Sequence, residues 1–212
     1  MAEPAGPRQG FFDLWSRFYD LAPVQAAVYR PVHEAVLEEL RSPMARRVLD
    51  VGCGTGNLTE RIARELHPEL AAGCDFSYGM LEQAAAKDAG RWWVQGDALR
   101  LPVRDESVDA VVSTESFHWF PDHDAALAEF HRVLAPSGRV LVALINPRIH
   151  LTSRAVRAGS QLVGEPAYWP TRQEMAERLH AAGFDVAHQR RVMRVAGLLL
   201  PTVLTVGVKG PR

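Results

Sequence analysis

Cysteine is scarce in this chain, which has only Cys53 and Cys74 in 212 residues. Disulfide scaffolds need more cysteines than this, and structural metal or redox sites need a closely spaced pair. Both residues fall near the ends of strands that we expect to be neighbours, so the two could lie close together. We therefore predict two reduced, partly buried thiols and no metal site.

An excess of charge of one sign is also missing, because 24 Lys and Arg residues face 25 Asp and Glu residues, for a net charge of −1. This balance disfavours a nucleic-acid partner. The most apolar stretch, residues 195–208, contains glycine and proline and is well short of the ~20 residues that a membrane-spanning helix needs. Residues 1–9 lack the pattern of a signal peptide and are expected to form a flexible tail. We expect a cytoplasmic protein with no integral membrane segment.

The remaining residues, 10–212, are predicted to form one domain, since 47% of the chain is apolar and can bury a substantial core. The centre of that domain is residues 46–56, Arg-Arg-Val-Leu-Asp-Val-Gly-Cys-Gly-Thr-Gly. Its first half has the apolar run of a buried parallel strand, and apolar residues recur at helical spacing after its last glycine. Glycines at 52, 54 and 56 allow a tight turn and the close approach of a ligand to the backbone.

The glycine spacing and two carboxylates indicate the kind of ligand. Dinucleotide sites use G-x-G-x-x-G, whereas here the third glycine comes one residue early and is followed by Asn57. Asp75 ends the next apolar run, where a carboxylate can accept hydrogen bonds from ribose. Asp50, at the strand tip, suits an ammonium or sulfonium group and repels phosphate. The pattern predicts an adenosine-type ligand without a pyrophosphate over the glycines.

Residues 48–56 resemble the first motif of class I S-adenosylmethionine (SAM)-dependent methyltransferases, particularly the group that includes the quinone-biosynthesis C-methyltransferases. Asp-Phe-Ser at 75–77, Gly-Asp-Ala at 96–98 and Leu-Ala-Pro-Ser-Gly-Arg at 134–139 resemble later motifs of that group, in order. The resemblance implies an α/β fold: a Rossmann-like, doubly wound sheet of seven strands with the last antiparallel, helices on both faces and an N-terminal helical lid.

The resemblance also implies SAM as cofactor and S-adenosylhomocysteine (SAH) as product. In the family, the acidic residue at the place of Asp97 bonds the adenine amino group, and Ala98 offers its backbone N–H to the ring. The residues expected to contact the cofactor are Tyr19, Asp50, Gly52, Cys53, Gly54, Gly56, Asp75, Phe76, Met80, Asp97, Ala98 and Ser113.

Helices and strands can be predicted for most of the chain. Residues 10–41 are predicted to be helical, broken near Pro23 and Pro31, and to form either a lid over the cofactor or an ordinary packed helix. Residues 147–169 are expected to be a loop or short helix that caps the substrate. The predicted helices are 78–87, capped by Ser77, 125–134, capped by Asp122, and 171–182, with a capping box at its start and Gly183 at its end. The predicted strands are 91–95, 107–113, 139–145 after a turn at 136–138, 184–194 and 198–208.

The catalytic residues would follow the fourth strand, at the edge where open α/β sheets bind ligands. If the acceptor is a hydroxyl, a base is needed, and His118 is the first candidate, with Glu115 the second. The alternative is that His118 only packs against the ligand or, through Trp119, against its own loop. His123, at a helix start, is expected to be exposed or bonded to a partner.

The acceptor site is predicted to be aromatic, which suits an apolar, aromatic or lipid-like small molecule, or a cationic amine. Its candidate walls are Phe11, Trp15, Tyr19, Phe117, His118, Trp119, Tyr168 and Trp169. Two other functions stay open: a non-catalytic protein that binds SAM or SAH as a sensor or partner subunit, and a nicotinamide-dependent oxidoreductase, which Asn57 and Asp50 disfavour. Monomer and homodimer are both open.

Overall fold

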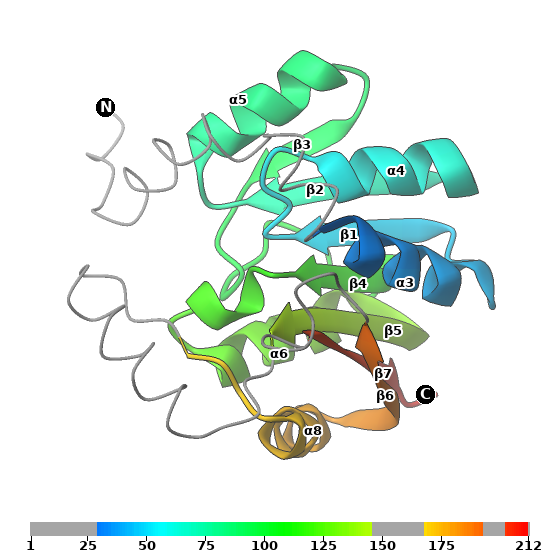
Figure 1. Ribbon diagram of the computed structural model, residues 1–212, viewed down its shortest axis with the longest axis vertical. Helices are drawn as coiled ribbons and strands as arrows, with labels where there is room; N and C mark the ends of the chain where they lie inside the picture. The colour runs from blue at the N-terminus through cyan, green and yellow to red at the C-terminus, as the bar shows by residue number, and fades with distance from the viewer. Residues whose placement is uncertain (1–28, 146–167, 193–201, 212) are drawn as a thin grey trace.

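The computed structural model describes residues 29–145, 168–192 and 202–211, which form one seven-stranded sheet between two layers of helices (Figure 1). The strand order is β3-β2-β1-β4-β5-β7-β6. The strands are β1 (Arg47–Val51), β2 (Leu70–Asp75), β3 (Trp92–Gln95), β4 (Val108–Thr114), β5 (Leu134–Ile145), β6 (Phe184–Val192) and β7 (Thr202–Lys209). Among these strands, β7 runs antiparallel to its two neighbours, β5 and β6, and all the other pairs are parallel. The predicted α/β sheet with an antiparallel last strand is confirmed.

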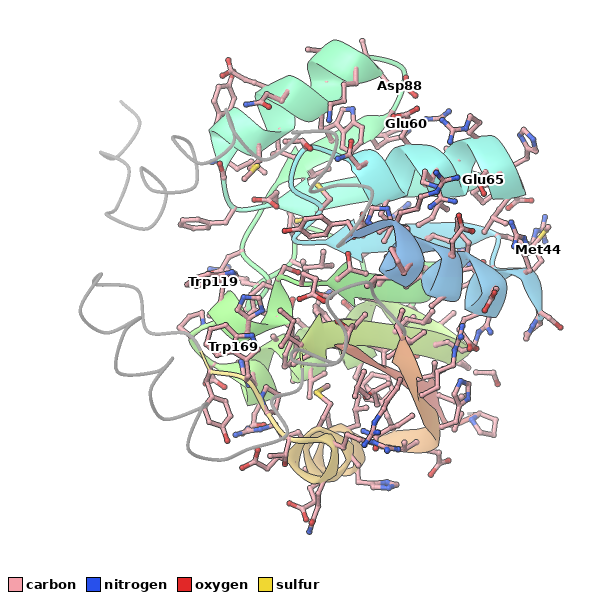
Figure 2. All side chains as sticks on the ribbon, viewed as in Figure 1. Met44, Glu60, Glu65, Asp88, Trp119 and Trp169 are labelled. Carbon is pink, nitrogen blue, oxygen red and sulfur yellow. The ribbon has the colours of Figure 1, made fainter. Side chains whose placement is uncertain are left out.

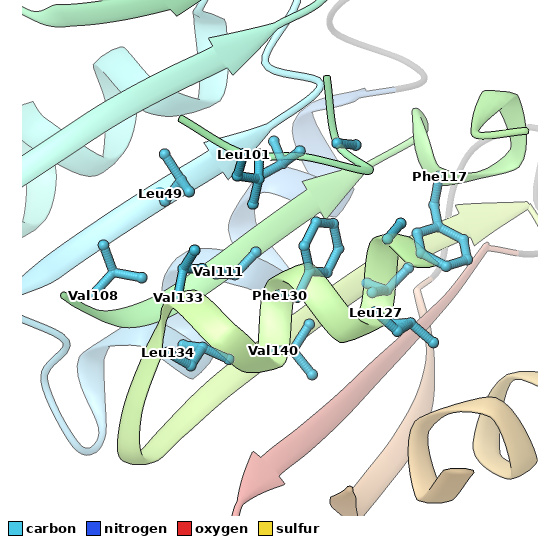
Figure 3. Close-up of a cluster of buried hydrophobic side chains, with 14 of the residues drawn as sticks. Leu49, Leu101, Val108, Val111, Phe117, Leu127, Phe130, Val133, Leu134 and Val140 are labelled. Carbon is cyan, nitrogen blue, oxygen red and sulfur yellow. The ribbon is translucent and has the colours of Figure 1, made fainter. Parts of the chain in front are cut away.

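Helices cover both faces of the sheet, as predicted. The first layer is α3 (Arg30–Arg41), α4 (Asn57–Leu66) and α5 (Tyr78–Lys87), and the second is α6 (His123–Val133) and α8 (Arg172–Ala181). Side chains of α3 and α4 share one buried cluster with alternate residues of the central strands. On the other face, Leu127 and Phe130 of α6 pack over Val111 of β4 and Val140 of β5 (Figure 3). Strand alternation thus divides the apolar residues between two cores.

The predicted helix caps are present. The Ser77 side chain accepts a hydrogen bond from the Met80 backbone N–H, and Asp122 accepts from the first turn of α6. Thr171 and Glu174 form the capping box of α8, and Gly183 follows that helix with φ +87°. Local side-chain chemistry therefore fixed these boundaries to within two residues of the sequence prediction.

The predicted separate turn at residues 136–138 is wrong, because these residues lie within β5. The pairing of β4 with β5 jumps from Val108–Leu134 to Ala110–Arg139, so the extra residues form an irregularity in the strand. Ser137 takes a left-handed φ of +61°, and a Cβ on Gly138 would lie 2.7 Å from the Ala135 carbonyl oxygen. The sequence correctly indicated turn-forming residues here, but β5 pairs with β4 both before and after the bulge, so the strand is not interrupted.

The N-terminal prediction can be tested only from Tyr29 onward. Pro31 lies in the first turn of α3, where a missing backbone N–H costs little. The Arg139 guanidinium donates to the Glu39 and Pro43 carbonyls at the other end of α3. The predicted lid residues Phe11, Trp15 and Tyr19, and residues 147–167, lie outside the described part of the chain. No helix within the described part is long and apolar enough to cross a membrane.

Candidate cofactor and acceptor site

The predicted polar residues gather at the carboxyl ends of β1, β2 and β4. The chain leaves β1 to form β2 on one side and later places β4 on the other side. Open α/β sheets bind ligands where the strand order reverses in this way, because the outgoing loops diverge. Asp50 and Asp75 mark one side of this reversal, and Glu115 and His118 follow the strand on its other side.

The glycine turn between β1 and α4 has the left-handed conformations that glycine permits, with φ of +73° at Gly52, +56° at Gly54 and +79° at Gly56. Two of these glycines are also required by the protein's own packing. A Cβ on Gly52 would lie 2.4 Å from Ser116, and one on Gly56 would lie 2.4 Å from the Trp93 ring. The sequence suggested a tight turn and the close approach of a ligand, and these two long-range contacts have no local signal.

Asp75 ties the end of β2 to this turn. Its Oδ2 accepts from the Gly54 backbone N–H at 2.8 Å, and its Oδ1 accepts from the Ser77 backbone N–H at 2.9 Å. The two bonds fix the plane of the carboxylate. A carboxylate is an acceptor only, which is the chemistry that ribose hydroxyls require.

Asp50 is buried beneath the turn, with 1% of its surface exposed. Its Oδ2 accepts from the Thr59 hydroxyl at 2.7 Å, whereas its Oδ1 is buried and has no hydrogen-bond partner, so far as the described residues go. Desolvation raises the pKa of Asp50 to about 7, the Asp75 charge adds to this, and the Thr59 hydrogen bond opposes it. An orphaned carboxylate oxygen beside a glycine turn fits a positively charged ligand such as SAM.

The two cysteine backbones are adjacent, with the Cys53 N–H 3.2 Å from the Cys74 carbonyl oxygen, and both thiols are free. Their side chains lie on opposite faces: Cys53 Sγ sits over Gly73, whereas Cys74 packs in the core under α6. Burial raises the pKa of the Cys53 thiol well above its usual range and that of Cys74 to about 12. Burial and the raised pKa values both disfavour the reactive thiolate form.

The other predicted cofactor residues lie at the same edge of the sheet or just behind it. Phe76 is 49% exposed directly after Asp75, while Met80 and Ala98 are buried. Asp97 Oδ1 accepts from the Leu99 backbone N–H at 2.9 Å. The Ser113 hydroxyl lies 2.8 Å from that of Ser116.

Glu115 is strained, with a φ of +54° directly after β4. Non-glycine residues in this region cost ~1 to 3 kcal/mol and cluster at functional sites. Its backbone N–H donates to Ala143 on β5, and its Oε1 accepts from the Thr202 hydroxyl at 3.3 Å. The carboxylate is therefore held between β4 and the start of β7.

His118 lies in a short 3-10 helix, Phe117–Trp119, and is only 7% exposed. Its ring stacks on Trp169 with centroids 4.7 Å apart and contacts Trp119 at 4.9 Å. Burial, with a smaller contribution from His123, lowers the pKa of His118 to about 3. In this arrangement the ring is a weak proton acceptor, and the contact with Trp119 matches the packing alternative.

Two segments that are fifty residues apart in sequence meet at this point. Figure 2 shows Trp119 and Trp169 at the same end of the sheet. The Tyr168 N–H donates to the His118 carbonyl at 2.9 Å, and the Tyr168 hydroxyl donates to Glu174 at 2.8 Å. His123, expected to be exposed or bonded to a partner, is only 6% exposed, and its Nε2 is unpartnered in the described structure. Only the aromatic character of these residues was visible in the sequence.

Comparison with known proteins gives a consistent answer. The family described as "Methyltransferase domain" matches residues 49–142. A demethylmenaquinone methyltransferase of Deinococcus radiodurans is 30% identical over 88% of this chain and 86% of that protein. A malonyl-[acyl-carrier protein] O-methyltransferase of Geobacter sulfurreducens is 41% identical over 56% of this chain, and the match spans 46% of that protein's length.

Among solved structures, one chain comes from the complex between the Haloferax volcanii Trm112 methyltransferase activator and a methyltransferase. It superimposes with a TM-score of 0.78 and 23% identity, over 94% of this chain and 97% of that chain. At this identity the likeness concerns the fold alone.

Proposed function

The chain belongs to the class I SAM-dependent methyltransferases, and we propose that it methylates a small apolar, aromatic or lipid-like molecule by in-line displacement. The observation that carries the acceptor class is the group of rings from His118, Trp119 and Trp169 at the carboxyl end of β4. Rings of this kind bind apolar and planar surfaces. The demethylmenaquinone methyltransferase among the relatives is named for a quinone-type acceptor, in keeping with this class.

SAM supplies an activated methyl group on a positively charged sulfur, so the protein needs no covalent intermediate. The residues of this chain bind, orient and exclude water. Asp50, Asp75 and the glycine turn would hold the cofactor, with Phe76, Met80, Asp97 and Ala98 on its adenine side. Tyr19, Phe11 and Trp15 stay predicted contacts from the N-terminal segment.

If the acceptor atom is a hydroxyl oxygen, the proton needs an acceptor. Glu115 is the better candidate of the two predicted bases, because its carboxylate is only partly buried and is held beside the end of β4. His118 is buried against two indoles, and the pKa of its ring is lowered to about 3. We propose that His118 shapes the acceptor site.

A non-catalytic SAM-binding protein is the second candidate, because Asp50, Asp75 and Asp97 serve binding alone. Family membership removes the nicotinamide alternative. Two experiments distinguish the methyltransferase from the non-catalytic binding protein. The first is calorimetry with SAH, and the second is incubation with methyl-labelled SAM and a pool of phenols, quinols, fatty acids and amines. We expect SAH to bind and label to pass to an apolar acceptor. Tight SAH binding with no transfer to any compound in the pool would favour the sensor.

A further inference from the structure

Three ring nitrogens at the acceptor end are buried without a hydrogen-bond partner in the described structure: His118 Nδ1, His123 Nε2 and Trp169 Nε1. They make up half of the six side chains with such atoms in the described residues. An unpaired buried polar group costs ~1 to 3 kcal/mol, so proteins seldom keep one without a reason. Three in one cluster indicate a partner that lies outside the described residues.

The three rings belong to one cluster. His118 stacks on Trp169 with centroids 4.7 Å apart and an interplanar angle of 19°. His123 contacts the ring of Tyr168, the neighbour of Trp169, at 5.6 Å. The ring of His123 also contacts that of Phe117, the neighbour of His118, with centroids 4.5 Å apart. We call these residues, with Trp119, the ring cluster.

The hydrogen-bonding character of these nitrogens restricts what can bind. The indole Nε1–H of Trp169 is a donor only, so its missing partner must carry a lone pair. His123 bonds the backbone of Phe117, and because Nε2 has no partner the bond is made by Nδ1. In the tautomer that donates from Nδ1 to the Phe117 backbone, Nε2 carries a lone pair. The cluster thus offers one fixed donor and at least one acceptor.

We infer that the ring cluster binds the polar group of the methyl acceptor and that this group is an oxygen, which accepts a hydrogen bond from Trp169 Nε1–H. The inference rests on the proposed function and narrows its substrate class to oxygen-bearing molecules such as phenols, quinols or carboxylic acids. A hydroxyl proton can be bound by an imidazole lone pair of the cluster. An ammonium group has no lone pair and cannot accept from Trp169, so an amine bound in its charged form is disfavoured.

Indole N–H resonances test this directly, because the chain has only five tryptophans. The protein, labelled with 15N and saturated with SAH, is titrated with p-cresol, toluene and benzylammonium, which share a ring and differ in polar group. Trp169→Phe identifies the Trp169 signal and keeps an aromatic side chain. Trp92→Phe on β3, where the side chain is 69% exposed, is the matched control.

We expect p-cresol to shift the Trp169 indole N–H downfield, saturably, with at least fivefold tighter binding than toluene or benzylammonium. Trp169→Phe should weaken p-cresol binding about tenfold and leave toluene binding unchanged, while Trp92→Phe changes neither. An unmoved Trp169 signal, or equal responses to p-cresol and toluene, would overturn the inference. The proposed function would survive that result if SAH binds and label is transferred. A protein that does not bind SAH would overturn both.

Discussion

Two groups of residues at the carboxyl end of the sheet have pKa values shifted in opposite directions: the predicted cofactor side around Asp50, and the predicted acceptor side around His118. On the predicted cofactor side, the pKa of Asp50 is raised to about 7, so this carboxyl keeps a proton at pH values where an ordinary carboxyl has lost it. On the acceptor side, burial lowers the pKa of His118 to about 3 and that of His123 to about 4, so both rings stay unprotonated at neutral pH. A positively charged ligand would favour the ionised form of Asp50 on the first side, whereas the buried rings of the second side are neutral at pH 7.

The strongest test of the cofactor side is Gly56→Ala. The new Cβ would meet the Trp93 ring at 2.4 Å, and φ is +79°. The ring cannot move freely, because its Nε1 donates to the Asp88 carbonyl at 2.8 Å. We expect the free energy of unfolding in urea to fall by ~3 kcal/mol, with SAH binding much weakened.

Gly210→Ala is the matched control, since nothing lies within 4 Å of its Cβ position. It should change the free energy of unfolding by less than ~0.5 kcal/mol. Equal stability of the two variants would show that the turn does not pack on Trp93 as described.

Asp50→Asn tests the charge of that side. A cationic ligand stabilises the ionised carboxylate, so SAM affinity should rise with pH through about 7 in the wild type. Removing the charge should weaken SAM binding ~10- to 100-fold at pH 8, or ~1.4 to 2.7 kcal/mol, and abolish this part of the pH dependence. Calorimetry between pH 6 and 8 measures both effects.

Asp50→Asn should weaken SAM binding but stabilise the protein without ligand. A raised pKa contributes stability below pH ~4 that is lost as the pH rises through about 7. Asp50→Asn without ligand should therefore unfold at a higher urea concentration than the wild type at pH 8. The exposed Asp185→Asn is the control and should change neither quantity. Weaker SAM binding by that variant as well would remove the special role of Asp50.

His118→Phe tests the acceptor side through its opposite sign. The pKa of His118 in the folded state, about 3, lies below its ordinary value of 6.5, so the unfolded chain binds the proton first. Its contribution to stability is present above pH 6.5 and is lost as the pH falls. Where the unfolded chain binds this proton and the folded protein does not, the free energy of unfolding changes by ~1.4 kcal/mol per pH unit.

Urea unfolding of His118→Phe between pH 4.5 and 6.5 should therefore show a slope smaller by ~1 kcal/mol per pH unit than the wild type. The exposed His180→Phe should retain the wild-type slope. A His118 variant that keeps the wild-type slope would mean that the ring titrates normally and is not buried as described.

The same comparison shows how far sequence could lead. The strands, the helix caps, the glycine turn and the antiparallel last strand were predicted because each depends on residues close together in the chain or on a family motif. Ser77, Asp122 and Thr171 act within their own helix starts, so their roles are readable locally. The cofactor side is mostly of this kind.

The acceptor side could not be predicted in the same way. The stacking of His118 on Trp169 joins segments that no motif links, and the unusual pKa of His118 arises from burial that the sequence does not state. The packing of Gly52 on Ser116 and of Gly56 on Trp93 was missed for the same reason. Such contacts depend on how distant strands bring their loops together.

Thr171→Ala is the mildest test and asks whether the acceptor side depends on α8. Thr171 Oγ1 accepts from the Glu174 N–H at 3.2 Å, and Glu174 in turn accepts from the Tyr168 hydroxyl at 2.8 Å. Loss of the cap should lower the free energy of unfolding by ~1 kcal/mol. Because the Tyr168 backbone N–H also donates to the His118 carbonyl, p-cresol binding should weaken about two- to threefold. This ratio corresponds to a loss of binding free energy of less than ~1 kcal/mol.

SAH affinity should stay unchanged in this variant, because no described contact of Thr171 reaches the glycine turn. Gln173→Ala, on an exposed position of the same helix, should alter none of these quantities beyond ~0.5 kcal/mol. If Thr171→Ala weakened SAH and p-cresol equally, the two sides would be one coupled unit, and the contrast between a carboxylate-lined cofactor side and an independent ring cluster would fail.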